Sequence, residues 1–156
     1  MSGASLIQLH DVSVAESIPE AERAATLQAV SLFYTFWNTG DASLLQQALS
    51  PGFTDRTLPD GRPQGPEGPA FASRTFRTAV PDLAVHVEKV VVAGRYVTVH
   101  MKFTGHFTGT FGSVKGQGAG VAFIATDLLE IDQGRIINNW HIEDNLTLFK
   151  QMGIVK

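Results

Sequence analysis

The sequence contains no cysteine and no long hydrophobic run, and each absence excludes a class of protein. Without cysteine the chain forms no disulfide, carries out no thiolate catalysis and has no sulfur ligand for zinc. The aliphatic run at 90–93, VVVA, is far shorter than the roughly 20 residues that a membrane span needs. Residues 1–17 lack the basic start and the apolar stretch of a signal peptide. We therefore expect a cytoplasmic protein without a membrane partner.

Clustered positive charge and metal-binding motifs are lacking as well. The net charge is −3, and the 12 Lys and Arg residues are scattered along the chain. Nucleic acids attract proteins through clustered basic residues, so we expect no nucleic-acid partner. The histidines show no metal-ligand spacing such as H-E-x-x-H, and no metal site is expected. The glycine-rich segment 109–120 lacks the phosphate-loop pattern, and we interpret it as a flexible hairpin that could act as a lid over a pocket.

Helical patterns occupy the first half of the chain. Ser17 and Glu20 have the spacing of a capping box, which predicts the start of a long amphipathic helix. Shorter apolar runs between turn formers predict further helices. The predicted helices cover residues 18–38, 42–49 and 69–79, and a last one follows Asp144.

Alternating patterns of apolar and polar residues follow in the second half. The predicted strands cover residues 83–93, 96–107, 120–131 and 135–144. Because helices come first and strands later, we predict an α+β domain in which helices pack on one face of a curved antiparallel sheet. The domain covers 17–156. Residues 1–16 form an N-terminal arm that is either loose or a strand borrowed by a neighbouring subunit.

The period of two in strands identifies the polar side chains that need an explanation. Asp127 falls in the apolar row of its strand, and a carboxylate inside a protein is costly unless it is paired or used. On the last strand Asn139, His141 and Glu143 share one face, and Trp140 lies on the other. Neither row of this last strand is plainly the one that faces the core.

Several segments along the chain form a larger pattern: FWNTGDASLLQQALSPGFTDR, AVPDL, FTGTF, DQGRI, WHIEDNL and FKQMG. Their order and spacing resemble the SnoaL-like polyketide cyclase (ester cyclase) family, from the first helix onward. The resemblance implies a cone-shaped barrel of the nuclear-transport-factor-2-like superfamily, usually a homodimer, with a deep apolar pocket. It also implies the intramolecular aldol cyclisation of a small polyketide or ester by acid/base catalysis without a cofactor.

The same resemblance places an acid/base residue directly after the tryptophan of the last strand. Family members carry Asp there, and this chain carries His141. Imidazole has an unperturbed pKa of about 6.5, so we expect His141 to act as a base at neutral pH without burial changing its pKa. Asp127 or Asp144 would orient the second ring nitrogen. His141, Asp127 and Asp144 are therefore the predicted catalytic residues.

The predicted ligand is a small apolar or aromatic carbonyl compound. Asn139 would donate a hydrogen bond to the oxyanion, and Glu143 shares its wall of the pocket. Trp37 and Tyr34 on the long helix would cover an aromatic ring. Phe107 stands where family members often carry a histidine. The predicted substrate-binding residues are thus Trp37, Tyr34, Asn139, Phe107 and Glu143.

Plainer interpretations stay open. His141 would then be a half-buried structural histidine, Asp144 the N-cap of the last helix, and the helical aromatics part of an ordinary core. A non-catalytic protein that holds an apolar ligand in the same cone is an alternative function. An isomerase, dehydratase or hydrolase on the same fold is another, because a fold does not fix a reaction.

Overall fold

A curved sheet forms the centre of the molecule. The structure is a computed structural model that describes residues 5–156. The strands are β1 (Val12–Val14), β2 (Leu49–Asp55), β3 (Ala84–Ala93), β4 (Tyr96–Phe107), β5 (Thr110–Phe111), β6 (Val114–Lys115), β7 (Ala119–Asp132) and β8 (Arg135–Glu143). Six of them form one sheet in the order β1-β3-β4-β7-β8-β2, and β5 pairs with β6 in a separate hairpin. The four central strands are antiparallel, whereas β1 and β2 join the edges in parallel.

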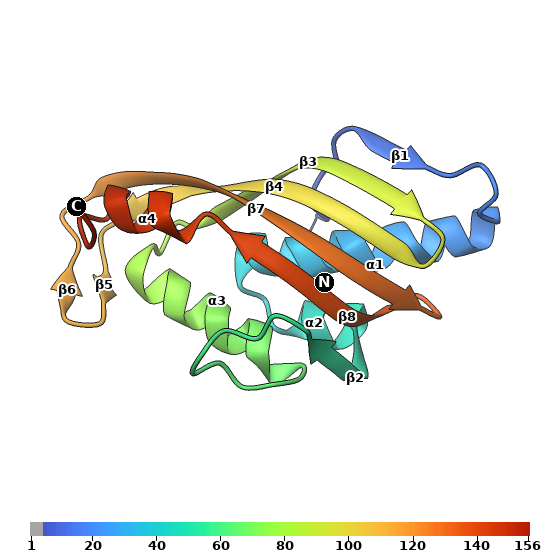
Figure 1. Cartoon of the computed structure of the whole chain (residues 1–156), viewed down its shortest axis with the longest axis horizontal. Coiled ribbons are helices and arrows are strands. Elements are labelled where there is room, and N and C mark those ends of the chain that lie inside the picture. Colours follow the sequence, from blue (N-terminus) through green and yellow to red (C-terminus); the bar gives the residue numbers. More distant parts are fainter. Residues whose placement is uncertain (1–4) are drawn as a thin grey trace.

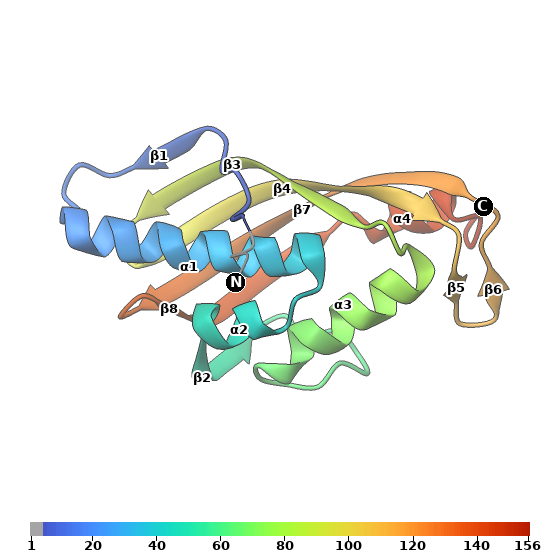
Figure 2. The same ribbon diagram turned by 180° about the vertical axis from the view of Figure 1, so that it is seen from behind.

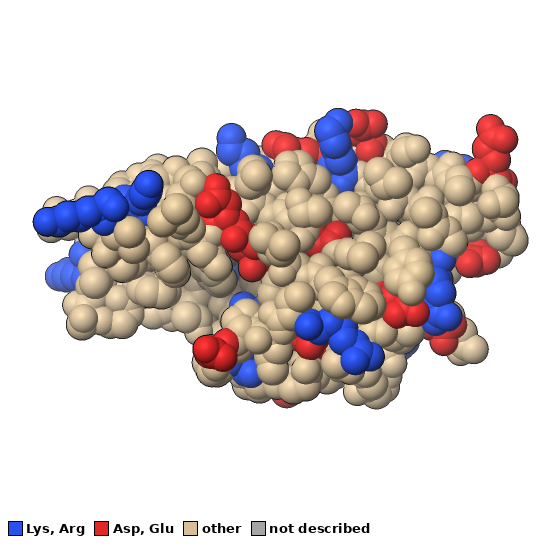
Figure 3. Space-filling model, viewed as in Figure 1, with Lys and Arg blue, Asp and Glu red and all other residues tan. Residues whose placement is uncertain are grey.

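The two longest helices cover one face of this sheet, which confirms the predicted α+β fold. The helices are α1 (Glu20–Thr39), α2 (Ser43–Ala48), α3 (Glu67–Ala79) and α4 (Asn145–Gln151). Figures 1 and 2 show α1 running along the sheet, with α3 beside it and α4 near the far end of β7. No helix within residues 5–156 is both long and apolar enough to cross a membrane. On the face drawn in Figure 3, acidic and basic side chains are interspersed among uncharged residues.

The start of α1 differs from the prediction. The N-cap is Pro19, with φ −56° and ψ 144°, and no side chain caps the helix. Pro19 accepts a hydrogen bond from the backbone N–H of Arg23 at 2.9 Å through its carbonyl oxygen. The predicted capping box is therefore wrong, because Ser17 lies two residues before the cap. The helix ends at Thr39, one residue beyond the predicted bound, and is capped by Gly40, whose φ of 78° suits a residue without a side chain.

Residues of the N-terminal arm lie against their own domain. Val12 pairs with Val90 and Val14 with Val92, so β1 forms the edge of the sheet next to β3. Residues 1–4 lie outside the described part of the chain. The strand 12–14 is thus supplied to the chain's own sheet.

The strand β2 is a feature that the sequence patterns did not predict. It contains Pro51 and Gly52, which signal a turn, and its pairing with β8 shifts register between Leu49 and Thr54. An edge strand tolerates such an irregularity because only one side needs partners. The pairing brings Asp55 opposite Asn139. A carboxylate from the first half of the chain thereby joins the last strand.

A bulge in β8 explains why its period did not reveal the core row. Ile136 pairs with Ile131, and Asn138 pairs with Glu130, so Ile137 is the extra residue between them. Ile136 and Asn139 therefore face the same side although they are three residues apart. Beyond the bulge the inward row continues with His141 and Glu143, next to the inward row of β7.

The inner rows of the long strands β4 and β7 follow the alternation of apolar and polar residues. The side chains of Val97, Val99, Met101 and Phe103 are at most 7% exposed. Asp127 lies in the inward row of β7 and is 6% exposed. Aromatic residues of α1 pack over these rows, and the rings of Phe103 and Phe123 stack at 5.1 Å. This packing encloses the polar residues that lie inside the sheet.

Candidate active site

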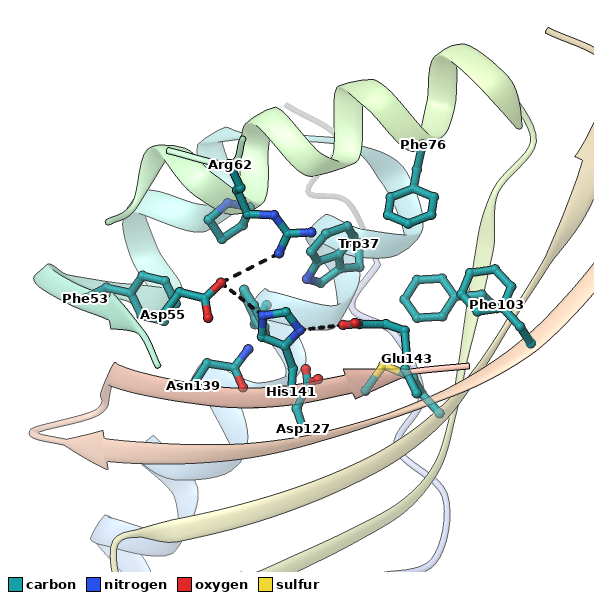
Figure 4. A pocket seen from close by; sticks show the side chains of 15 residues that line it. Trp37, Phe53, Asp55, Arg62, Phe76, Phe103, Asp127, Asn139, His141 and Glu143 are labelled. Atoms are coloured by element: carbon teal, nitrogen blue, oxygen red, sulfur yellow. Dashed lines mark hydrogen bonds and ion pairs between the residues drawn. The ribbon is translucent and has the colours of Figure 1, made fainter. Parts of the chain in front are cut away.

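A narrow cavity lies between the inner face of the sheet and the helices α1 and α3. One wall is polar and comes from β2, β7 and β8, and the other is aromatic (Figure 4). The centres of water molecules can occupy about 40 Å³ of it, and the empty space between its lining atoms is about 560 Å³, part of which is continuous with solvent. The lining residues are Phe33, Trp37, Phe53, Asp55, Arg62, Pro69, Phe76, Met101, Phe103, Phe123, Ala125, Asp127, Asn139, His141 and Glu143.

His141 lies at the centre of the polar wall, between two carboxylates. Its Nδ1 is 2.6 Å from Oε1 of Glu143, and its Nε2 is 2.9 Å from Oδ2 of Asp55. The ring is only 7% exposed. Its backbone is fixed as well, because the N–H of His141 donates to the Thr57 hydroxyl at 3.0 Å. Both ring nitrogens are thus engaged, which requires a proton on each if both are to donate.

The surroundings of His141 change its pKa, so the prediction of an unperturbed histidine is wrong. Burial of the ring lowers the pKa, but the hydrogen bonds and negative charges of Glu143 and Asp55 together outweigh it and raise the pKa to about 9. At neutral pH the ring is an imidazolium. It is therefore a source of positive charge in the cavity and has no free nitrogen to accept a proton.

Asp127 is the residue in the cavity whose pKa lies near neutrality. Burial raises its pKa from 3.8 to about 7, although the hydrogen bond from Tyr34 and the charge of His141 act in the opposite direction. The Tyr34 hydroxyl donates to Oδ2 at 2.6 Å. Within residues 5–156 the second oxygen, Oδ1, accepts no hydrogen bond from another side chain. Asp127 thus has one oxygen held in place and one that can exchange a proton.

Two further polar groups in the cavity have unused hydrogen-bonding capacity. The Oδ1 atom of Asn139 is buried and has no partner within the described chain. The guanidinium of Arg62 lies 3.7 Å from Oδ2 of Asp55, which is longer than a hydrogen bond. Both residues line the same cavity.

The structure brings most of the predicted site residues together. His141, Asp127, Asn139, Glu143 and Trp37 all line the cavity. The ring of Trp37 meets that of Phe103 edge to face at 6.2 Å. The sequence left open which row of the last strand faces inward. The structure shows that it is the row that contains His141.

Three predicted site residues lie outside the cavity lining. Tyr34 is fully buried behind it and contacts the cavity through Asp127. Asp144 N-caps α4 by accepting the backbone N–H of Thr147 at 3.1 Å, and hydrogen bonds from Thr147 lower the pKa of Asp144. Phe107 is 2% exposed and packs beneath the β5–β6 hairpin near Gly116. Neither Asp144 nor Phe107 is placed to touch a ligand there.

The sequence analysis missed Asp55 and Arg62. Asp55 stands in the segment FTDR, which was noticed only as part of the family pattern. Arg62 lies in the loop 56–66, where turn formers hide any periodic signal. The lid prediction is also wrong, because none of residues 109–118 appears among the residues that line the cavity.

No cluster of three or more His, Asp and Glu side chains within residues 5–156 is arranged to hold a metal ion. The three polar groups Asp55, His141 and Glu143 instead satisfy one another. The remaining strand histidines face outward. His106, for example, is paired with the exposed Asp82 at 2.7 Å.

This fold and this site define a class of protein: an α+β cone of the nuclear-transport-factor-2-like type with acid/base side chains in its cavity. The model of the SnoaL-like polyketide cyclase family matches residues 27–152, and the chain belongs to that family.

Solved structures agree with this assignment. A proposed polyketide cyclase from Bacillus cereus ATCC 10987 is 35% identical, with a TM-score of 0.88 over 98% of this chain and 97% of that one. TsrD from Streptomyces laurentii is 26% identical, with a TM-score of 0.76 over 85% of this chain and 98% of that one. IdmH, a proposed polyketide cyclase from Streptomyces antibioticus, is 23% identical, with a TM-score of 0.73 over 82% of this chain and 98% of that one, a likeness of fold. No curated protein shows a significant match to the chain.

Proposed function

We propose that this protein is a cofactor-independent cyclase that closes a ring by an intramolecular aldol reaction of a small polyketide-like or ester-bearing carbonyl compound. The observation that carries the proposal is the pairing of Asp127 and His141 on adjacent strands inside an apolar cavity. One group titrates near neutrality, and the other is positively charged there. General acid/base catalysis requires such a poised group next to a charge that stabilises the intermediate.

The proposed reaction begins with a proton transfer to Asp127. Its free oxygen takes the proton from the carbon beside a carbonyl group, and the electrons of the broken C–H bond form an enolate. The imidazolium of His141 stabilises the negative charge that develops in the cavity. The side-chain amide of Asn139, which lines the same cavity, would donate a hydrogen bond to the enolate oxygen.

The ring then closes within the same molecule. The enolate carbon attacks a second carbonyl carbon, a C–C bond forms, and the electrons of that carbonyl move to its oxygen. This alkoxide takes the proton back from Asp127, so the product is an isomer of the substrate. The aromatic wall contributes by folding the substrate so that its two carbonyl groups meet.

The proposal predicts that Asp127 is needed for proton exchange. Deuterium incorporation into the acidic carbon of a β-keto ester, followed by NMR in heavy water, should fall about 100-fold or more in the Asp127→Asn variant. In the wild type the rate should rise as the pH passes through about 7, because Asp127 must be ionised to accept a proton.

Asp144→Asn is the matched control for this experiment. It removes a carboxylate outside the cavity, and asparagine is also a good N-cap, so the fold and the exchange rate should be unchanged. Wild-type exchange that persists in Asp127→Asn would overturn the assignment of the base. A wild type that binds the ester without any exchange would point instead to a ligand-binding protein.

We also propose that the chain forms a homodimer through the outer face of its sheet. Ile142 is 76% exposed and Ile124 is 47% exposed, and both lie on that face of the adjacent strands β8 and β7. Leu128 is 38% exposed and pairs with Trp140 on the same face. Neighbouring apolar side chains on a sheet surface favour burial against a partner.

A further inference from the structure

Arg62 is the cation of the cavity that has no hydrogen-bonded partner. Its side chain is 16% exposed and lines the cavity, yet its guanidinium donates no hydrogen bond to any residue within 5–156. The nearest carboxylate oxygen, Oδ2 of Asp55, is 3.7 Å away. That oxygen already has the imidazolium of His141 at 2.9 Å, so Asp55 does not depend on Arg62. The partly buried guanidinium is thus held near Asp55 by charge alone, and its N–H donors are available to a ligand in the cavity.

The loop 56–66 holds Arg62 in position. Gln64 accepts the backbone N–H of Asp55 at 2.8 Å and donates to its carbonyl oxygen at 2.9 Å, which fastens the loop to β2. The stem of Arg62 packs beside Gly68, where an added Cβ would come within 3.6 Å of it. Figure 4 shows the guanidinium reaching into the cavity from the side of α3, toward Asp55 and His141. The loop and the packing of the side chain thus fix the position of the guanidinium before a ligand binds.

The charges in the cavity favour a neutral ligand over an anionic one. Arg62 and His141 are positive, Asp55 and Glu143 are negative, and Asp127 supplies a further negative charge when it is ionised. When Asp127 is ionised the negative charges exceed the positive ones by one, and a carboxylate entering the cavity would add to this excess. A neutral compound that gives its proton to Asp127 instead leaves the total unchanged, because the negative charge moves from Asp127 to the bound enolate.

We propose that Arg62 is a specificity-determining residue that chelates the two oxygens of a 1,3-dicarbonyl substrate as its enolate forms. The planar guanidinium presents parallel N–H donors, and the two oxygens of such an enolate lie in one plane on the same side of the carbon skeleton. The inference rests on the proposed function and narrows it: the substrate carries two carbonyl groups separated by the acidic carbon, next to an aromatic or apolar body that lies against the ring wall.

The test compares two ligands that differ by one carbonyl group. Benzoylacetone is a phenyl 1,3-dicarbonyl, and butyrophenone has the same length and phenyl ring with a single carbonyl. Calorimetric titration should show that the wild type binds benzoylacetone roughly tenfold to a hundredfold more tightly than butyrophenone. In Arg62→Leu this preference should fall to about threefold or less, while butyrophenone binding is unchanged. Arg62→Lys retains the positive charge but lacks the two parallel N–H donors of the guanidinium. It should therefore show only a minor part of the wild-type preference for benzoylacetone.

Arg56→Leu is the matched control, because Arg56 opens the same loop but is exposed and contacts Asn138 outside the cavity. It should leave both affinities unchanged. An undiminished preference in folded Arg62→Leu, or a full preference in Arg62→Lys, would overturn the inference. Calorimetry needs no turnover, so its result is separate from the exchange experiment on Asp127. The dicarbonyl preference can fail while Asp127-dependent exchange persists, and the reverse outcome is equally recognisable.

Discussion

His141 is held between two carboxylates, and the folded structure therefore stabilises its protonated form. The Nδ1 and Nε2 atoms contact Glu143 and Asp55 at 2.6 and 2.9 Å. The contact with Asp55 is buried and the contact with Glu143 is partly buried, and charges in such surroundings interact more strongly than in water. Removing the ring leaves these two acidic groups close together without the intervening cation.

The pH dependence of stability should report this arrangement. The pKa of His141 rises from 6.5 to about 9 on folding, so the folded state binds the proton more tightly. The resulting stabilisation is complete below pH 6.5 and is lost as the pH rises through about 9. Urea unfolding should therefore show a loss of about 3 kcal/mol between these pH values.

The control for this measurement removes the other group that titrates near neutrality. In an Asp127→Asn background, adding His141→Gln should abolish the loss of stability between pH 6.5 and 9. The same slope with and without His141 would show that other groups cause it.

The sequence predicted correctly which residues of the last strand share a face, because this depends only on neighbours within the strand. Asn139, His141 and Glu143 do share one wall of the cavity. The raised pKa of His141 was not predicted: Glu143, two residues away in the same row, contributes more to it, and Asp55, which lies 86 positions earlier in the chain, adds to it. Asp127 was recognised by its row alone, since a carboxylate among apolar residues is visible in any alternating pattern.

At the scale of elements, the β5–β6 hairpin is fixed to α3 by close backbone contact. The N–H of Gly109 donates to the carbonyl oxygen of Ala79 at 3.0 Å. A Cβ at Gly109 would lie 1.8 Å from the carbonyl oxygen of Thr78, and backbone cannot yield to it cheaply. The hairpin is therefore a docked element that supports the end of α3.

Gly109→Ala should destabilise the protein by about 2–4 kcal/mol, because the added methyl group would displace the hairpin from the end of α3. Thermal or urea unfolding measures this loss. Gly120→Ala is the control: a Cβ there meets nothing within 4 Å, and the change should stay within about 0.5 kcal/mol. Equal stability of the two variants would contradict the docking of the hairpin.

The elements that could be predicted from sequence are those with a strong period of their own. The long helix and the central strands have such a period, and the structure contains them within a few residues of the predicted bounds. The strand β2 and the bulge at Ile137 depend on which segment pairs beside them. Pairing partners distant in the chain leave no local pattern, so these two features needed the structure.

At the scale of the whole molecule, the sheet divides two apolar surfaces. Its inner face lines the cavity, and its outer face carries exposed Ile124, Leu128 and Ile142. The inner face is covered by α1 and α3 (Figures 1 and 2), whereas the exposure of Ile124 and Ile142 shows that the outer face is open at these residues. A second copy of the chain would cover that outer face.

Ile142→Lys should therefore convert a dimer into a monomer. Light scattering should give the wild type twice the chain mass of 16.8 kDa, and the variant that mass alone. A charge at this position would be buried without a partner in the dimer. Phe71→Lys places the same charge on an exposed residue of α3 and should leave the dimer intact. A monomeric wild type would reject the proposed interface.

The two tryptophans lie on opposite sides of the sheet, which gives the molecule two separate optical reporters. Trp37 lines the cavity among aromatic rings, and Trp140 lies beside Leu128 on the outer face. Ligand entry changes the surroundings of the first indole, and subunit association those of the second. Trp140→Phe leaves an intrinsic fluorophore that responds to the cavity, and Trp37→Phe leaves one that responds to assembly. The fluorescence of the two variants can thus report ligand binding in the cavity and association of subunits independently, without an added dye.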